Sequence, residues 1–413
     1  MSFLGVAGSP DSLSSLPGPQ ASEALRTKAV FQTPELEESN AWMAVKEAPM
    51  ENTMTISLTN PPDAVIGCYQ LSTKVSSCLK HSNQNLGEMM CFWPQRKRDR
   101  RTYVLNDSRI IFRGVEKHIR AQGWNFGQFE EDILNICFCI LDRSPSHPDD
   151  PATEVSHHHD PIYVTGAISA MVNSNNDQGV VQGQCQGKYG GSTSSLALAW
   201  RRGHSAQVVQ GQVQASQIRP VLGLRWILQA PCSSLLGCLG IATRVVSKFN
   251  LAHDMGRNLS VDKYMDSFGR TLEDLMEDSM CWFVRQDLGP SYNGWQVLDA
   301  TPREESESVF QCGPASVTAI REGDVHQAHD SPSVFAEVNA DYITWLWNED
   351  EAGSVCPQTL STKKMGRCLS TKAVGSDSRV DITSLYKYPE VTRLLQRDNR
   401  GPPPGQALSH VMW

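Results

Sequence analysis

The sequence lacks several features that would place it in a specialised class. No apolar run approaches the roughly 20 residues that a membrane-spanning helix requires. The 12 cysteines include no Cys-x-x-Cys pair, so we expect reduced, buried thiols and no zinc site. A basic excess is also missing: the formal charge is -8 and the pI about 5.8, which argues against a nucleic-acid partner. The start of the chain lacks the basic and apolar regions of a secretory signal, and we therefore expect a cytoplasmic protein.

Composition divides the 413 residues into four parts. Residues 1–40 are rich in Ser, Pro, Gly and Glu and are predicted to be disordered. Residues 41–95 carry alternating polar and apolar positions and predict β-strands. Residues 96–398 have the mixed periodicity of a globular core, and the Pro- and Gly-rich residues 399–413 predict a disordered tail.

Two elements of the core are predicted from local patterns. A helix opens near Trp124, and a single apolar face follows at helical spacing: Phe129, Ile133, Ile136, Cys137 and Ile140. Residues 334–347 are rich in β-formers on both sides of Asn339–Asp341, which predicts a hairpin with a tight turn there.

The most informative stretch surrounds Asp299. Residues 292–302 read Tyr-Asn-Gly-Trp-Gln-Val-Leu-Asp-Ala-Thr-Pro, a turn followed by a buried strand that ends in an acid, and Cys-Gly-Pro-Ala follows at 312–315. This text resembles the transglutaminase family, and its epidermal-type members most closely, over about residues 50–395. Members of the family join glutamine side chains to amines through a cysteine thioester.

The resemblance implies an α+β fold. It would comprise a papain-like core preceded by a partial N-terminal β-sandwich, whose earlier strands we expect to be missing. The two C-terminal β-barrels of the family are expected to be absent from this chain. Partners would be proteins that bear glutamine and lysine side chains.

The family uses a Cys-His-Asp triad, and Asp299 matches its acid. In such a triad a thiolate at a helix N-terminus attacks the carboxamide, a histidine takes the proton, and the aspartate orients that histidine. Counting back from the Cys-Leu-Gly-Ile text at 238–241 places Leu224 and Arg225 where the family has glutamine and the catalytic cysteine. Arginine stays protonated at neutral pH and cannot be the nucleophile.

The surroundings of that position also depart from the family. Pro231 falls inside the helix that should carry the nucleophile, where proline costs about 3 kcal/mol or more, so we expect a disturbed scaffold. Cys185, in a Gly-Gln-Cys tripeptide, and Cys232 are alternative nucleophiles, although a surface loop and a buried thiol are the simpler interpretations. Trp200 is a loose match to the tryptophan that stabilises the oxyanion in the family.

The histidine of the triad has no counterpart. The family block Trp-Asn-Phe-His-Val-Trp is missing, because Glu277-Asp278-Ser279-Met280 runs directly into Cys281-Trp282. That block supplies a central strand as well as the base, so we expect a hole in the sheet. The run at 157–159, three consecutive histidines, is interpreted as a surface segment with weak adventitious metal binding as an alternative.

The resemblance also implies Ca²⁺ sites, built from the oxygen ligands that this ion prefers. The first would use Ala170 (through its carbonyl), Asn173, Asn175 and Asp177, with an Asn-rich turn as the alternative. The second would use Asp254, Asn258, Ser260 and Asp278, weakened because Gly256 replaces an acid. The third would use Asn339, Asp341 and Glu390, weakened because its second glutamate falls at Leu395.

The sequence leads to three functional hypotheses. The first is a catalytically silent member of the family that serves binding or scaffolding. The second is an active calcium-dependent protein-glutamine γ-glutamyltransferase with a displaced nucleophile. The third, an unrelated binding module that borrowed the core, has the weakest support.

Overall fold

The computed structural model describes more than half of the chain: residues 3–6, 12–17, 21–31, 42–46, 54–61, 63–75, 78–86, 97–130, 133–144, 150–172, 183–184, 221–222, 226–249, 259–265, 276–299, 311–347, 355–361 and 365–389. The chain forms two compact units. The first contains Met1–Asp107, Phe126–Gly223 and Pro231–Thr243, and the second contains Ser108–Asn125, Leu224–Ala230 and Arg244–Trp413. Within the described residues, every helix is too short or too polar to cross a bilayer.

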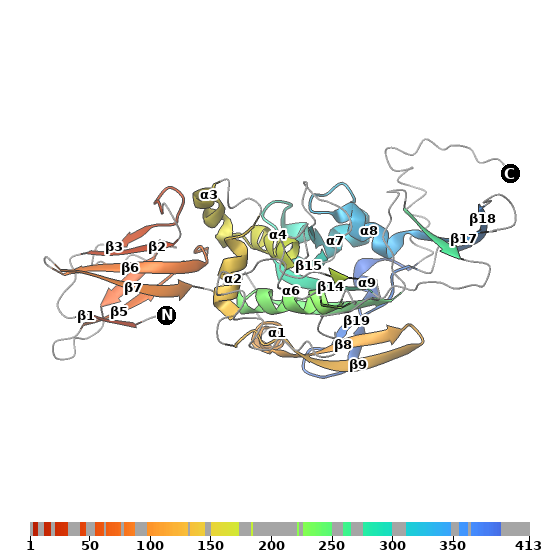
Figure 1. The fold of residues 1–413 in the computed structure, drawn as a ribbon, viewed down its shortest axis with the longest axis horizontal. Helices are drawn as coiled ribbons and strands as arrows, with labels where there is room; N and C mark the ends of the chain where they lie inside the picture. The colour runs from red at the N-terminus through yellow and green to blue at the C-terminus, as the bar shows by residue number, and fades with distance from the viewer. Residues whose placement is uncertain are drawn as a thin grey trace. The chain divides into compact units, whose positions relative to one another are not determined.

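The first unit begins with two antiparallel sheets, drawn in red to orange in Figure 1. One sheet has the strand order β1 (Phe3–Val6), β5 (Met54–Thr59), β4 (Met43–Lys46). The other has the order β3 (Ala29–Phe31), β2 (Ser12–Pro17), β6 (Gly67–Val75), β7 (Cys78–Leu86).

The prediction of disorder over residues 1–40 is wrong at three strands. β1 pairs with β5 and β2 pairs with β6, with Leu13 opposite Thr73 in the second case. The early strands that we expected to be missing are therefore present. Their partners lie about 50 residues away in sequence, and such pairing overrides a local composition that disfavours structure.

The remaining part of the first unit is largely helical. Its helices are α1 (Lys97–Tyr103), α2 (Ile133–Leu141), α3 (Pro151–Ser156), the 3-10 turn η1 (His157–His159) and α4 (Pro161–Val172). The predicted helix is present as α2, which buries Ile133, Ile136, Cys137 and Ile140, but its predicted start near Trp124 is wrong because Trp124 belongs to a strand. Phe129 lies outside this helix and is 59% exposed, so its assignment to the apolar face is wrong. This unit also contains a parallel pair of short strands, β10 (Gly183–Gln184) and β11 (Val221–Leu222).

The histidine run at 157–159 is not entirely a surface segment. His158 is 3% exposed, and its Nε2 lies 3.1 Å from Oε1 of the buried Glu154. Ser144 and Tyr163 donate hydrogen bonds to the same carboxylate oxygen, at 3.0 and 2.7 Å. The carboxylate therefore gathers three partners around one buried position, a structural role that the sequence did not indicate.

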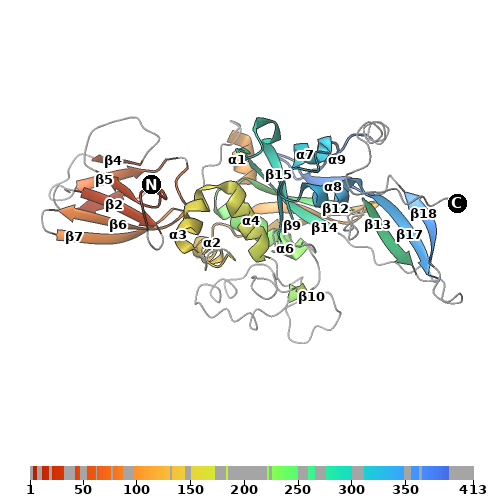
Figure 2. The same ribbon diagram turned by 90° about the horizontal axis from the view of Figure 1, so that it is seen from above.

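The second unit is built on a six-stranded sheet. Its strand order is β16 (Cys312–Ser316), β15 (Gly294–Asp299), β14 (Met276–Phe283), β12 (Thr243–Phe249), β19 (Arg367–Lys372), β20 (Arg379–Asp381). A second sheet contains β13 (Ser260–Met265), β17 (Asp341–Trp347) and β18 (Val355–Ser361), which lie side by side in Figure 2. A hairpin joins β8 (Ser108–Val115) and β9 (His118–Asn125). The helices are η4 (Pro290–Tyr292), α7 (Val317–Glu322), α8 (Ser331–Asn339) and α9 (Thr383–Tyr386).

The expected hole in the sheet is absent at the place where it was predicted. β14 lies between β15 and β12, with Ser279 opposite Leu298 and Met280 opposite Val297. Met280 is fully buried in the core of this unit. A strand is retained because the backbone groups of its neighbours need hydrogen-bond partners, and the residues from Met276 onward supply them.

The predicted hairpin over residues 334–347 is half wrong. The first arm is the helix α8, and only the second arm is a strand, β17. Pro332 lies in the first turn of α8, a position that favours helix initiation. Val334 and Val338, one turn apart, both join the buried core, so tertiary burial outweighs the β-preference of valine.

The helix α6 (Trp226–Cys238) runs through Pro231. The helical scaffold that we expected to be disturbed by this proline is therefore present. Its first residues belong to the second unit and its last turns to the first.

Candidate functional site

Asp299 is the last residue of β15, a strand whose burial increases along its length. The aspartate is 1% exposed and lies opposite Cys312 of β16. The register of the two strands shifts between Val297 and Asp299. Gly313 has φ +90°, and a Cβ there would overlap the carbonyl of Val297, so only glycine permits this close approach of the backbones.

Cys312 is the cross-strand neighbour of Asp299, but its thiol is not activated. Burial raises its pKa well above the ordinary value, and the negative charges of Asp330, Asp299 and Glu337 raise it further. Lys248 acts in the opposite direction with less effect. A thiol in this environment stays neutral and is a poor nucleophile, since the thiolate is the reactive form.

A buried ion pair lies among the same groups. Nζ of Lys248, in β12, is 2.7 Å from Oε2 of Glu337, in α8, and the two side chains are 0% and 4% exposed. Because the two opposite charges are so close, each compensates the other in a place that water does not reach. The pair connects the main sheet to the helix that packs against it.

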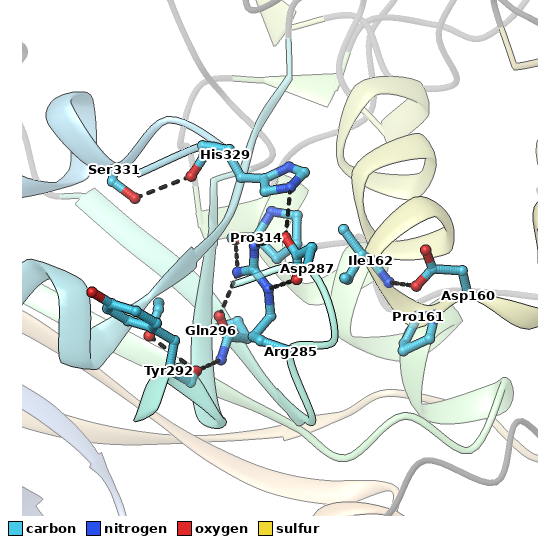
Figure 3. Close-up of polar contacts among 12 residues, drawn as sticks. Asp160, Pro161, Ile162, Arg285, Asp287, Tyr292, Gln296, Pro314, His329 and Ser331 are labelled. Atoms are coloured by element: carbon cyan, nitrogen blue, oxygen red, sulfur yellow. Dashed lines mark hydrogen bonds and ion pairs between the residues drawn. The ribbon is translucent and has the colours of Figure 1, made fainter. Parts of the chain in front are cut away.

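Arg285 connects two neighbouring strands and a loop through its hydrogen bonds (Figure 3). Its Nη1 donates to Oε1 of Gln296 at 2.8 Å and to the carbonyl of Pro314 at 2.7 Å. Its Nε and Nη2 donate to the two carboxylate oxygens of Asp287 at 2.9 and 2.6 Å. Arg285 is 1% exposed, and this guanidinium therefore joins the loop after β14 to both β15 and β16.

Asp287 has a second basic neighbour besides Arg285. Nε2 of His329 lies 3.2 Å from Oδ2 of Asp287. Partial burial acts to raise the pKa of Asp287, but the hydrogen bonds and charge of Arg285 outweigh it, and His329 adds to them, so that this pKa lies below its ordinary value. The aspartate is thus an ionised partner of two basic groups.

The predicted catalytic residues are only partly within the described structure. Asp299 is buried at the end of its strand, as expected of a triad acid. Arg225, Trp200 and Cys185 lie outside the described residues. Cys232 is 0% exposed inside α6, in agreement with the buried-thiol interpretation.

The predicted calcium ligands are also only partly described. Ala170 lies in the last turn of α4, Asp278 in β14 and Asn339 at the end of α8. Ser260 and Asp341, assigned to two different sites, are cross-strand partners in the parallel pair β13–β17. The other ligands lie outside the described residues: Asn173, Asn175, Asp177, Asp254, Asn258 and Glu390. In the described part of the chain, no three His, Cys, Asp or Glu residues gather as a metal cluster would.

Sequence reasoning missed Lys248, Glu337 and Arg285. One signal was available: Lys248 lies close to Val245, Val246 and Phe249 in the sequence, and a charge among such residues usually needs a buried partner. The identity of that partner, 89 residues away, follows only from the fold.

Comparison with known proteins identifies the class of this α+β fold. The model of the transglutaminase N-terminal domain, described as "Transglutaminase family", matches residues 12–76. The crystal structure of red sea bream transglutaminase superposes with a TM-score of 0.76 and 31% identity, covering 95% of this chain and 61% of that one.

Two curated relatives give the same result. The chain is 65% identical over 395 residues to human protein-glutamine gamma-glutamyltransferase 6, covering 91% of this chain and 55% of the relative. It is 45% identical over 392 residues to bovine protein-glutamine gamma-glutamyltransferase E, covering 90% of this chain and 56% of the relative. The chain thus spans little more than half the length of these relatives. It belongs to the transglutaminase family.

Proposed function

We propose that this chain is a transglutaminase-family protein without protein-glutamine γ-glutamyltransferase turnover. The observation that carries the proposal is the composition of the strand beside Asp299. β14 reads Met-Glu-Asp-Ser-Met-Cys-Trp-Phe and contains no histidine. The acid of the family triad is present, whereas the base that it would orient is not on the adjacent strand.

The chemistry requires all three groups. A thiolate must attack the glutamine carboxamide, and a base must accept and return a proton as ammonia leaves. Arg225 stands at the nucleophile position and cannot lose its proton at neutral pH. His329 pairs with Asp287, and Cys312 has a raised pKa, so neither supplies a ready base or thiolate to Asp299.

The second candidate is an active enzyme with a displaced nucleophile. Cys232 is fully buried and lies in the seventh position of α6, away from the helix N-terminus that would lower its pKa. Cys185 retains the Gly-Gln-Cys tripeptide, and β10 ends at the residue before it. This tripeptide is the only specific feature that favours the second candidate.

An amine-incorporation assay separates the two candidates. The purified chain is incubated with casein, a fluorescent primary amine and millimolar Ca²⁺, with and without iodoacetamide, and human protein-glutamine gamma-glutamyltransferase 6 is the positive control. We expect no thiol-sensitive incorporation. Incorporation that iodoacetamide abolishes would refute the proposal, and its loss in Cys185→Ala but not Cys232→Ala would identify the displaced nucleophile.

We further propose that the chain binds Ca²⁺ through Ala170, Asn173, Asn175 and Asp177. The support is the match to the family ligands at every position and the placement of Ala170 in the last turn of α4, where carbonyl groups have no helical partner. Millimolar Ca²⁺ should raise the melting temperature, and Asp177→Ala should abolish the increase. Asp377→Ala, which removes a carboxylate that is 78% exposed, is the matched control and should retain it.

The proposed role is binding or scaffolding of proteins that bear glutamine and lysine side chains. The cytoplasm is the proposed location, because scattered cysteines without a Cys-x-x-Cys pair suit a reducing compartment. Cross-linking to neighbouring proteins in cells, followed by mass spectrometry, would test the partner class. Recovery of secreted proteins alone would contradict the proposed location.

A further inference from the structure

Two thiols of the first unit lie in contact although they are 101 positions apart in the sequence (238 minus 137). Cys137 is in the middle of α2, and Cys238 is the last residue of α6. The two thiols lie close enough for each to shift the pKa of the other. Sγ of Cys137 also lies 3.7 Å from the carbonyl oxygen of Leu235, which is three residues before Cys238 and on the same side of the helix.

The two thiols have different access to solvent. Cys137 is 0% exposed, whereas Cys238 is partly exposed. A reagent in solution therefore reaches Cys238 first. The buried Cys137 contacts α6 one turn before Cys238, and it is therefore placed to react with an adduct that forms on Cys238.

The pKa values of the two thiols are shifted in opposite directions. The hydrogen bond from Cys137 lowers the pKa of Cys238, against the effect of its partial burial. Burial raises the pKa of Cys137, and the contact with Cys238 raises it further. Cys139, also on α2, has its pKa raised by burial and by the charge of Asp142, and therefore serves as an internal comparison.

We propose that Cys137 and Cys238 form a reversible disulfide site that reacts with small-molecule disulfides of the glutathione class. The site does not involve Asp299 or any other residue of the candidate catalytic cluster. It therefore stands independently of the catalytic silence proposed above.

The reaction occurs in two exchange steps. The Cys238 thiolate attacks one sulfur of oxidised glutathione, forming a mixed disulfide and releasing one glutathione thiolate. Cys137 then gives up its proton to water or buffer and attacks the Cys238 sulfur, which releases the second glutathione. Two protein thiols are oxidised and one oxidised glutathione is reduced to two thiols. The resulting bond would join α2 to the last turn of α6.

Peptide mapping tests the site directly. Reduced protein is incubated with oxidised glutathione, free thiols are blocked with N-ethylmaleimide, and the tryptic digest is analysed by mass spectrometry. Trypsin places Cys137 with Cys139 in peptide 121–143, and Cys238 with Cys232 in peptide 226–244. The Cys139→Ser/Cys232→Ala double variant therefore makes the assignment unambiguous and should still form the linked peptide pair.

Single variants test the two roles. In Cys137→Ser, Cys238 should retain glutathione as a persistent adduct, whereas Cys238→Ser should leave Cys137 unmodified. Cys238 should react at least about tenfold faster than Cys139, because the thiolate is the attacking species. Oxidation of the double variant should raise its melting temperature by at least about 5 °C, since a bond closing a long loop restricts the unfolded chain.

Three results would overturn the proposal. The first is a persistent glutathione adduct on Cys238 of the unmutated protein without a linked peptide pair. The second is equal reactivity of Cys238 and Cys139. The third is a linked pair that dithiothreitol does not reverse.

Discussion

Two of the charged side chains buried in the second unit, Lys248 and Arg285, contact carboxylates. Lys248 contacts Glu337, and Arg285 contacts Asp287 through two parallel hydrogen bonds. Charges removed from water are tolerated when such contacts replace the lost hydration. At the scale of single residues, the stability of this unit therefore depends on buried ion pairs. Removing one member of a pair should cost more stability than removing both.

The Lys248–Glu337 pair allows this difference to be measured. Glu337→Gln removes the negative charge that lies 2.7 Å from the buried ammonium group, and we expect a loss of about 3–5 kcal/mol in the free energy of unfolding. The double variant Lys248→Met/Glu337→Leu removes both charges and should recover most of that loss. Urea unfolding measures each value.

The matched control for this experiment is Asp377→Asn, which neutralises an exposed carboxylate 3.6 Å from Lys372. Its effect should be much smaller, because exposed ion pairs contribute little. A double variant as unstable as Glu337→Gln would show that the side chains matter for another reason than charge compensation.

Asp287 predicts a pH dependence whose sign is fixed by its lowered pKa. A carboxyl group whose folded-state pKa lies below its ordinary unfolded-state value binds fewer protons when folded, so its contribution to stability is complete above the unfolded-state pKa. The contribution is lost as the pH falls through the lower folded-state pKa. Asp287→Asn should therefore be less stable than the unmutated protein at neutral pH, and the two stability curves should approach each other in acid. A constant difference at every pH would contradict this account.

Residue-level prediction from the sequence succeeded where local pattern and burial agreed. Asp299 ends an apolar strand, and the structure buries it there. Lys248 and Arg285 could not be assigned partners, because the partner of Lys248 comes from an element that the sequence represented as a strand rather than a helix. The local pattern gave the position of a charge but not what neutralises it.

At the scale of elements, the wrong predictions concern helices and strands that depend on contacts with distant parts of the chain. α2 has a clear apolar face and was predicted, whereas β1 and β2 consist of short segments that become strands only by pairing with β5 and β6. α8 has a β-rich sequence, yet its valines are buried as a helical face. These elements depend on the partner surface, which local sequence does not encode.

α6 provides an element-scale prediction, because it contains Pro231 in its interior. Proline there lacks the N–H that a preceding carbonyl would accept, so Pro231→Ala should stabilise the protein by about 1–3 kcal/mol. Pro332→Ala in the first turn of α8 is the matched control and should have no stabilising effect, since proline suits that position. Thermal and urea unfolding measure both. A loss of stability in Pro231→Ala would indicate that the ring is needed for packing.

At the scale of the whole molecule, the continuous sheet predicts a sharp, cooperative unfolding transition. A sheet with a missing strand would instead unfold over a broad range. β14 supplies the strand between β15 and β12, so the second unit has an uninterrupted sheet in its described part. The printed sequence of β14 contains no histidine, and its backbone pairs with β15 from Ser279 to Phe283. Fold and chemistry can thus be separated in this chain.

That separation leads to a prediction for Arg225→Cys. The substitution returns a thiol to the position where the resemblance places the family nucleophile, but it supplies no histidine to β14. Because the members of a catalytic triad act as a unit, removal of one typically costs about 10⁴-fold or more in rate. We therefore expect amine incorporation by Arg225→Cys to stay at least about 10⁴-fold below that of human protein-glutamine gamma-glutamyltransferase 6. Iodoacetamide-sensitive incorporation approaching the relative's rate would mean that another group of the chain serves as the base, and the histidine-free strand would then no longer explain the silence.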